Sequence, residues 1–413
     1  MIRLLQIGKY FPPAAGGIEA VTAAIRTQLA PLAEVTTLVA NHDEGEVVES
    51  FPPFASRQLV IRSRSLGRLF SMPICPSLPA QLARHTRRSA GGESADVLLL
   101  HHPNPMASAA YALARPTCPL VVFYHSDIVR QRALGAACSI LTAHVLNRAA
   151  AVVVTSPTLL VHSRILRRHR GKCTVVPLGI DPTRWMPTTP AGEGGIDPTD
   201  PMRQAFTGRT VLFVGRLVYY KGLSVLLEAM ASVPHAELVL AGQGPLGPQL
   251  RQQARCLGIA DRVHFAGRVS DQQLRGYYQA ASVFVLPSTA ASEAFGLVQL
   301  EAMAAGTPVV STRLKTGVPW VNRHEMTGLT VPPNDSVTLA AALRELLDAP
   351  GLARRYGRAG QRRVLGRFTL EHFRQRLWGV LEAVLAGGGR RLRRRRPPAG
   401  RPAEGVAEAA IHA

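Results

Sequence analysis

No run of about 18 uncharged apolar residues, the length that a membrane-spanning helix needs, occurs in the sequence. The first residues, MIRLLQIGKYFPP, also lack the apolar core of a signal peptide and lead directly into an expected strand. The sequence therefore predicts a cytoplasmic chain that does not cross a membrane.

Cysteine is scarce, odd in number and without the spacing of metal ligands. The five residues are Cys75, Cys118, Cys138, Cys173 and Cys256. Such a set is typical of a reducing cytoplasm, where we expect free thiols packed in the interior. The loops expected after the strands also lack an Asp-x-Asp motif, so we expect no metal site there.

Acidic residues are too few to balance the basic ones, because 27 Asp and Glu against 48 Lys and Arg give a formal net charge of +21. Such an excess suits a polyanion, either nucleic acid or an anionic membrane surface. Zinc-finger spacing, a basic zipper and an aromatic RNA-binding motif are absent, and basic clusters at 57–68, 84–88 and 164–172 flank apolar segments. We therefore favour peripheral membrane contact over nucleic acid. A GC-rich gene, which encodes arginine often, is an alternative explanation of the same charge.

The 413 residues suffice for two domains with separate cores. Near-continuous apolar strands alternate with helical segments over residues 1–180 and again over 209–372, with a Pro- and Gly-rich linker at 181–208. This order predicts the α/β class, with two doubly wound, Rossmann-like parallel sheets covered by helices on both faces. Ligands of such folds bind at the carboxyl ends of the strands, so functional residues should follow strands directly. Residues 387–413 form a basic, low-complexity tail that we expect to be disordered.

Two glutamates, Glu293 and Glu301, flank the expected start of a helix in the segment SEAFGLVQLEAMAAGTPVV. The helix should begin near Phe295–Gly296, with the N–H groups of Gly296, Leu297 and Val298 directed into the cleft. A helix N-terminus attracts phosphate, and carboxylates beside it can accept bonds from sugar hydroxyls. The combination suits a nucleotide sugar, in which phosphate joins two sugars. A capping acid with an unrelated surface acid is the alternative.

Three further motifs follow expected strands. In FVGRLVYYKG, Arg216 and Lys221 can neutralise a diphosphate leaving group without a metal. In FYHSDIVRQ, His125 ends an apolar strand and is expected at the reacting sugar, although a packed, hydrogen-bonded histidine is the commoner case. In PPAAGGIE, Gly16 and Gly17 form a loop without side chains, which lets backbone approach a ligand closely.

The segment AGQGPLG matches the G-x-G-x-x-G pattern of dinucleotide-binding proteins through Gly242, Gly244 and Gly247. The acid expected about 20 residues later is missing, because the next strand ends VHFAG, and Pro245 interrupts the motif. NAD binding is therefore disfavoured, while a glycine turn lining a nucleotide pocket stays open.

Together these motifs, with Glu293 and Glu301 in the form E-x7-E, resemble the retaining glycosyltransferases of family four, which have the GT-B fold. The resemblance extends from LLQIGKYFPPAAGGIE to the terminal helices and leaves out only the basic tail. The segments GKYFPPAAGGIE, HHPNP, FYHSDIVRQ, VPLGID and STRLKTGVPWVNRHEMTGLTVPPND are similar to bacterial mannosyltransferases of O-antigen and exopolysaccharide assembly.

The resemblance implies that the C-terminal domain binds the donor. Arg216 and Lys221 would bind the diphosphate, and the amides of Leu297 and Val298 its phosphate. Glu293 and the backbone at Phe295–Gly296 would hold sugar hydroxyls. Glu301 would bind the ribose, and Val269 of GRVSD would lie by the base.

The N-terminal domain would bind the acceptor. Its Gly16–Gly17 loop would approach the donor, and His125 would contact the transferred sugar near its anomeric carbon. A final helix over 373–386 would cross back onto this domain.

The implied reaction moves a hexose, with mannose from GDP-mannose favoured, onto a polyprenyl-diphosphate-linked saccharide with retention of configuration. We expect no cofactor or metal, no nucleic-acid partner, and peripheral attachment to the anionic inner face of the cytoplasmic membrane. The alternatives are a UDP-hexose donor with the same chemistry, and a nucleotide-sugar-binding protein without catalysis.

Overall fold

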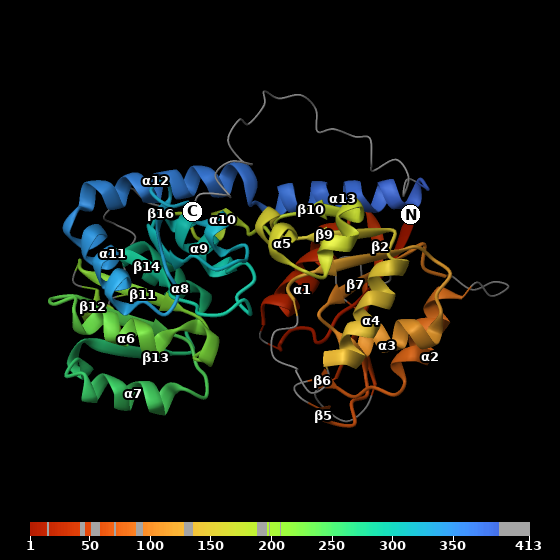
Figure 1. Ribbon diagram of the computed structural model, residues 1–413, viewed down its shortest axis with the longest axis horizontal. Helices are drawn as coiled ribbons and strands as arrows, with labels where there is room; N and C mark the ends of the chain where they lie inside the picture. The colour runs from red at the N-terminus through yellow and green to blue at the C-terminus, as the bar shows by residue number, and fades with distance from the viewer. Residues whose placement is uncertain are drawn as a thin grey trace.

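The computed structural model describes residues 1–14, 16–41, 46–50, 58–69, 72–87, 94–127, 135–187, 196–197, 199–206 and 208–387. The basic tail beyond residue 387 and the ends of two predicted basic clusters, Arg57 and Arg88, lie outside these ranges. Two sheets lie side by side, and helices cover both faces of each (Figure 1). The predicted pair of doubly wound α/β domains is therefore confirmed.

The first sheet has the strand order β10-β9-β8-β7-β1-β2-β4-β3, and only β3 runs antiparallel to its neighbour. Its strands are β1 (Ile2–Ile7), β2 (Ala33–Ala40), β3 (Val47–Ser50), β4 (Gln58–Ser63), β7 (Val97–His102), β8 (Leu120–Tyr124), β9 (Ala151–Val154) and β10 (Cys173–Val175). Its helices are α1 (Gly17–Leu29), α2 (Leu78–Thr86), α3 (Pro105–Ala114), α4 (Gly135–Arg148) and α5 (Pro157–His162). Strands β7, β8 and β9 are buried throughout, as expected for parallel strands covered on both faces.

The second sheet is wholly parallel, in the order β13-β12-β11-β14-β15-β16. Its strands are β11 (Thr210–Val214), β12 (Glu237–Ala241), β13 (Val263–Gly267), β14 (Val283–Leu286), β15 (Val309–Thr312) and β16 (Gly328–Val331). The helices that follow are α6 (Leu223–Ala231), α7 (Gly247–Cys256), α8 (Asp271–Ala280), α9 (Leu297–Ala305), α10 (Val318–Val321), α11 (Ser336–Asp348), α12 (Pro350–Arg367) and α13 (Leu370–Leu385).

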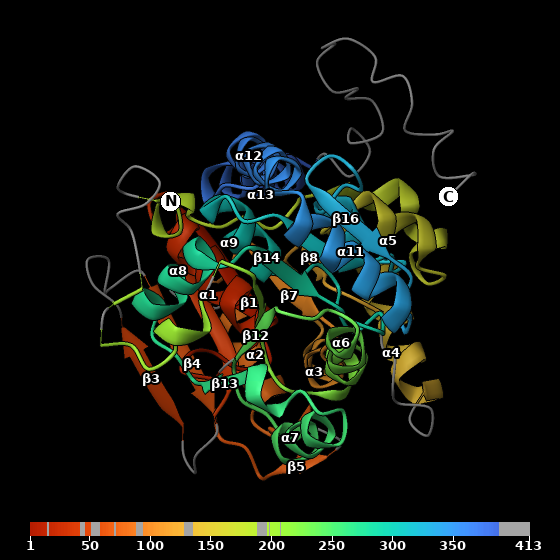
Figure 2. The same ribbon diagram turned by 90° about the vertical axis from the view of Figure 1, so that its left-hand side faces the viewer.

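The chain passes from the second domain back to the first between α12 and α13. There the N–H of Ile180 donates to Phe368 O at 2.8 Å, and the N–H of Leu370 donates to Ile180 O at 2.9 Å. Helix α12 packs against α9, whereas α13 packs against α1 and β9. Figure 2 shows α12 and α13 nearly end-on and almost in line, so the last two helices connect the two domains along one side of the molecule.

One edge of the first sheet was not predicted. Strand β4 contains Arg62, whose guanidinium lies 2.9 Å from Glu49 of β3 and donates to the backbone oxygens of Phe11 and Pro12 at 3.3 and 2.7 Å. Arg62 is therefore buried and neutralised. Arg62 is thus not available for the membrane contact that the basic cluster over 57–68 was expected to favour. A small antiparallel pair, β5 (Arg68–Leu69) with β6 (Met72–Pro73), was also missed.

None of the described helices is both long enough and apolar enough to cross a bilayer. The five cysteines are unpaired, and four of them are buried or half-buried. Cys256 is exposed, so the expectation that every thiol is packed is wrong for this residue.

Candidate active site

The candidate site lies where the second sheet reverses its strand order. Strands β11 and β14 are neighbours there, although β12 and β13 separate them in the sequence. Loops that follow two such strands meet at the carboxyl edge of the sheet and form a crevice. The loop after β11 carries Arg216 and Lys221, and the loop after β14 carries Glu293. The topology thus brings the predicted cations and the first predicted carboxylate together.

Lys221 and Glu293 form an ion pair at this edge. Nζ of Lys221 lies 2.6 Å from Oε2 of Glu293, and each residue is only 8% exposed. Ser288 Oγ donates a second hydrogen bond to the same carboxylate oxygen at 2.9 Å. The sequence predicted both residues at the site but not their pairing. Because the carboxylate neutralises the ammonium, the excess positive charge here must come from other groups.

Arg216 provides that excess charge. Its side chain is exposed, and it forms no hydrogen bond or ion pair with any residue that the structure describes. Its backbone is fixed on both sides, since Gly215 N–H donates to Ala241 O at 2.9 Å and Leu217 N–H donates to Gln243 O at 3.0 Å. The guanidinium is therefore available to a ligand on a rigid base.

The start of α9 provides donors for an anion. Gly296 precedes the helix with φ 72°, a left-handed conformation that other residues adopt only with strain, and no side chain caps the helix. The N–H groups of Leu297 and Val298 lack acceptors within the helix because the first turn has no preceding carbonyls. Amides and helix dipole together favour a bound phosphate.

Phe295 and Val269, which were also predicted at the site, are buried and half-buried. The ring of Phe295 is buried and lies near those of Trp320 and Phe368, so a ligand could meet only its backbone, whose carbonyl oxygen already accepts from Gln299 Nε2 at 2.8 Å. Val269 follows β13, is half-buried and packs against the core. Neither contact tests the predicted roles.

Glu301 belongs to a different cluster, on the second turn of α9. Tyr278 of α8 donates to its Oε2 at 2.9 Å. Burial raises the pKa of Glu301 to about 7, although the Tyr278 bond and the charge of Arg184 act in the opposite direction. Within the described chain Glu301 shares no hydrogen bond or ion pair with Lys221 or Glu293, so the two acids of E-x7-E act separately.

The raised pKa of Glu301 predicts a pH-dependent stability. Its folded pKa lies above the ordinary value of 4.5, so the stability contributed by the protonated acid is complete at low pH and is lost as pH rises through about 7. The Glu301→Gln variant stays neutral. Relative to the wild type, its free energy of unfolding should therefore rise by about 2 kcal/mol between about pH 5 and pH 8. This is less than the full pKa shift would give, because the half-buried side chain is partly screened by solvent. Denaturant titrations at both pH values measure this, and a constant difference between the two proteins would contradict it.

The glycines of AGQGPLG have a structural role. A side chain at Gly242 would collide with the carbonyl of Gly215, and one at Gly244 with the carbonyl of Leu217. The two glycines thus let the loop after β12 pack against the residues on either side of Arg216. This packing explains why a dinucleotide fingerprint without its acid occurs here.

In the first domain, Gly16 and Gly17 lie at the start of α1. The Glu19 carboxylate occupies the position of a side chain at residue 16, whereas none of the described atoms lies within 4 Å of that position at residue 17. The backbone at Gly17, the first residue of α1, is therefore open to a ligand, whereas that at Gly16 is covered by Glu19.

His125 follows β8 and is 5% exposed. Its Nε2 lies 2.9 Å from Nδ1 of His101, and its ring stacks on Phe123 with centroids 4.7 Å apart. Burial, and then the neighbouring histidines, lower the pKa of His125 well below its ordinary value, so the ring is neutral. The sequence missed His101, although VLLLHH places it at the end of the adjacent strand.

Within the described ranges, no group of three or more His, Cys, Asp or Glu side chains gathers as metal ligands would.

The predicted residues of the first domain, Gly16, Gly17 and His125, share no described hydrogen bond or ring contact with Arg216, Lys221 or Glu293. The candidate site therefore consists of a compact second-domain cluster and a separate His125 cluster.

Comparisons with known proteins cover both domains. The family model described as "Glycosyltransferase Family 4" matches residues 15–184, and "Glycosyl transferases group 1" matches residues 203–363. O-antigen chain mannosyltransferase C of Escherichia coli is 31% identical over 380 residues, which are 90% of this chain and 95% of the relative. D-rhamnosyltransferase WbpZ of Pseudomonas aeruginosa is 36% identical over 276 residues, 67% of this chain and 70% of the relative.

Solved structures agree with these matches. Sucrose-phosphate synthase from Thermosynechococcus elongatus superposes with a TM-score of 0.77 at 26% identity, covering 94% of this chain and 100% of that one. HepE of Anabaena in complex with UDP-glucose has a TM-score of 0.71 at 20% identity and coverages of 93% and 100%, a likeness of fold alone. The predicted GT-B fold is confirmed.

Proposed function

Because this chain belongs to glycosyltransferase family 4, we propose that it moves mannose from GDP-mannose onto a polyprenyl-diphosphate-linked saccharide, with retention, during assembly of a surface polysaccharide such as O-antigen. The observation that carries this proposal is the grouping of exposed Arg216, buried Lys221 and the uncapped start of α9 at the switch point of the second sheet. These groups suit the diphosphate of a nucleotide sugar.

The reaction would take place on one face of the sugar. The bond between the anomeric carbon and the donor phosphate oxygen breaks, and the acceptor oxygen bonds to that carbon from the same side. The acceptor proton passes to the leaving phosphate. Arg216, Lys221 and the α9 amides stabilise the charge that develops on the diphosphate.

Glu293 is better suited to positioning than to nucleophilic attack. A double displacement requires a carboxylate oxygen free to bond to the anomeric carbon. Oε2 of Glu293 accepts from Lys221 and Ser288, so the ion pair withdraws charge from this carboxylate and weakens it as a nucleophile, while Oε1 is left to accept from a hydroxyl. We therefore assign Glu293 to binding of sugar hydroxyls and to holding Lys221.

A donor panel tests the proposed substrate. Purified protein is incubated with membrane lipids and either GDP-mannose or a UDP-hexose, and nucleoside diphosphate release is measured with and without the lipid acceptor. Mannose is favoured by the likeness to an O-antigen mannosyltransferase. Acceptor-dependent release of GDP supports the proposal, release of UDP alone favours the UDP-hexose alternative, and binding without release favours the non-catalytic one.

Metal dependence gives a separate prediction. Fixed cations and helix amides would carry the charge of the leaving group, so we expect EDTA to leave turnover unchanged once the lipid acceptor is present. The rate is compared before and after chelation, with readdition of Mg²⁺ as the control. Loss of activity on chelation and its recovery with Mg²⁺ would contradict metal-free catalysis.

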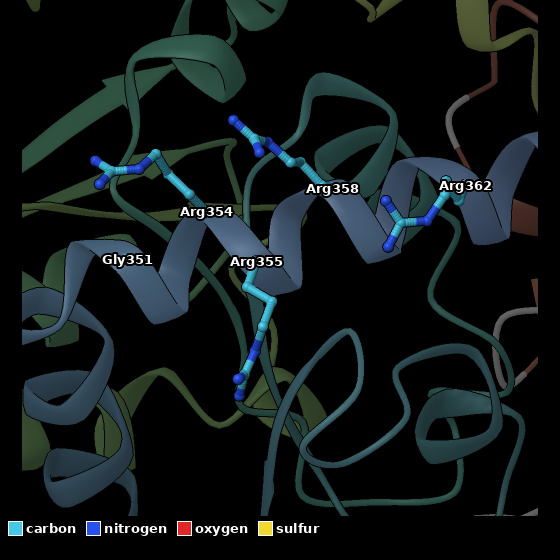
Figure 3. A pocket seen from close by; sticks show the side chains of 5 residues that line it. All are labelled: Gly351, Arg354, Arg355, Arg358 and Arg362. Atoms are coloured by element: carbon cyan, nitrogen blue, oxygen red, sulfur yellow. The ribbon is translucent and has the colours of Figure 1, made fainter.

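The acceptor would be lipid-linked, which requires contact with a membrane, and α12 supports such contact. Every charged residue of α12 is an arginine. Arg354, Arg355, Arg358 and Arg362 are exposed and line a pocket with Gly351 (Figure 3). Like charges one helical turn apart repel one another, and no acid on α12 offsets this. Anionic lipid headgroups would offset it.

Vesicle binding tests this surface. Each arginine near an anionic bilayer contributes about 1 kcal/mol, so replacing Arg354, Arg358 and Arg362 by alanine should weaken binding to vesicles containing phosphatidylglycerol by about a hundredfold. A comparison variant replaces Arg164, Arg167 and Arg168, three exposed arginines of the basic cluster at 164–172 that the sequence also linked to membrane contact. If only this variant loses binding, the docking surface lies on the first domain and not on α12. Binding to phosphatidylcholine vesicles should be weak for every protein.

A further inference from the structure

A chain of hydrogen bonds links His125 to the interior of the first sheet. His125 Nε2 lies 2.9 Å from His101 Nδ1, and His101 Nε2 lies 3.3 Å from Gln6 Oε1. Gln6 lies on β1, His101 lies on β7, and His125 directly follows β8. These three strands are neighbours in the sheet. The three residues are 0%, 1% and 5% exposed, so water does not compete for these bonds.

The orientation of the Gln6 amide is fixed by its other contacts. Its nitrogen lies 3.0 Å from the backbone oxygen of Thr22 and 2.8 Å from Oγ1 of Thr37. A carbonyl oxygen only accepts, so the NH₂ group of Gln6 must face Thr22. The reversed amide would place two acceptor oxygens against each other in a buried site. Oε1 of Gln6 therefore faces His101.

This orientation determines the tautomer of both histidines. Gln6 Oε1 only accepts, so Nε2 of His101 carries the hydrogen and Nδ1 of His101 accepts. Nε2 of His125 must then carry its hydrogen and donate it to His101. Burial lowers the pKa of His101 to about 3 and that of His125 well below its ordinary value, so neither ring carries a second proton.

We propose that Gln6 and His101 are positioning residues that hold His125 in the Nε2–H tautomer, so that His125 offers a ligand only the acceptor Nδ1. None of the described residues bonds to that nitrogen. His125 can then accept a hydrogen bond from a sugar hydroxyl but cannot supply a proton to the reaction. The tautomer follows from the hydrogen bonds alone, and only the identification of the ligand as a sugar rests on the proposed function.

Nitrogen NMR of protein labelled in its histidine rings tests the tautomer without any substrate. The His125 signals are assigned by their loss in His125→Asn. We expect Nε2 of His125 to be protonated and Nδ1 to have the shift of an unprotonated ring nitrogen. A proton on Nδ1, or on both nitrogens, at neutral pH would overturn the proposal.

Variants of His101 test the positioning role. Asparagine can place its side-chain oxygen near the former Nδ1, so His101→Asn should keep the His125 tautomer and most of the activity. His101→Leu should give mixed tautomers and reduce kcat/KM about ten- to a hundredfold through misplacement of the ring. An unchanged His125 spectrum in His101→Leu would overturn the role of His101.

Two comparisons keep the result interpretable. His102→Leu makes the same change at the next residue of β7, whose ring stacks on Tyr124 instead, and it should leave the His125 spectrum unchanged. If His101→Leu does not fold, Gln6→Met replaces it, and mixed His101 and His125 tautomers are the expected result. A wild-type spectrum as expected with no sugar transfer would reject the proposed function and leave the tautomer assignment intact.

Discussion

The Lys221→Ala variant is expected to turn over at least about a hundredfold more slowly than the wild type and to be less stable. The rate falls because the ammonium would stabilise the leaving diphosphate, and loss of one such donor typically costs a factor of about 10²–10³. Stability falls by about 3 kcal/mol because Glu293, 8% exposed and paired at 2.6 Å, would be left as an uncompensated buried charge. Product formation and denaturant unfolding measure the two effects.

A double variant separates these effects. Lys221→Met with Glu293→Gln removes both charges while keeping similar side-chain volumes, so most of the lost stability should return. Activity should not return, since neither the cation nor the carboxylate is restored. Wild-type activity in Lys221→Ala would remove the assigned role of this lysine, whatever its stability.

Arg216→Ala should cause a comparable loss of turnover, about a hundredfold, with little change in stability. The guanidinium is exposed and has no ion-pair partner within the described chain, so its removal should alter the free energy of unfolding by less than about 0.5 kcal/mol. Initial rates over a range of donor concentrations and a denaturant titration provide both numbers. The contrast with Lys221 follows from the different burial of the two cations.

Two further variants control this experiment. Arg344→Ala removes an exposed arginine from α11 and should leave the rate unchanged. Arg216→Lys keeps the charge but loses the planar pair of donors, so it should recover only part of the rate. A wild-type rate in both Arg216→Ala and Arg344→Ala would remove the assigned role of Arg216, and an equal loss in both would show that general positive charge matters instead.

The sequence alone places the candidate site, because parallel sheets place ligands at strand ends. Arg216 and Lys221 directly follow an apolar strand, and Glu293 follows another, so each could be found from its own segment. Their mutual geometry could not. The Lys221–Glu293 pair depends on β11 and β14 being adjacent, which is a property of strand order and not of sequence order.

The interior of the first sheet was harder to predict for a related reason. Periodicity shows that the β7 segment is buried. It does not show that His101 meets His125 at the end of the neighbouring strand β8, or that Gln6 orients both rings. For Arg62, the environment expected from the sequence was wrong. A basic residue was expected at the surface, whereas Glu49 on an unpredicted antiparallel strand neutralises it. Tertiary partners decide the state of such polar residues, and one sequence does not reveal them.

A crystal structure with bound GDP tests most directly whether the second-domain cluster holds the donor diphosphate. We expect phosphate oxygens within about 3 Å of Lys221 Nζ, of the Arg216 guanidinium and of the amide of Leu297 or Val298. A diphosphate bound elsewhere, for instance against the α12 arginines, would contradict the proposed site.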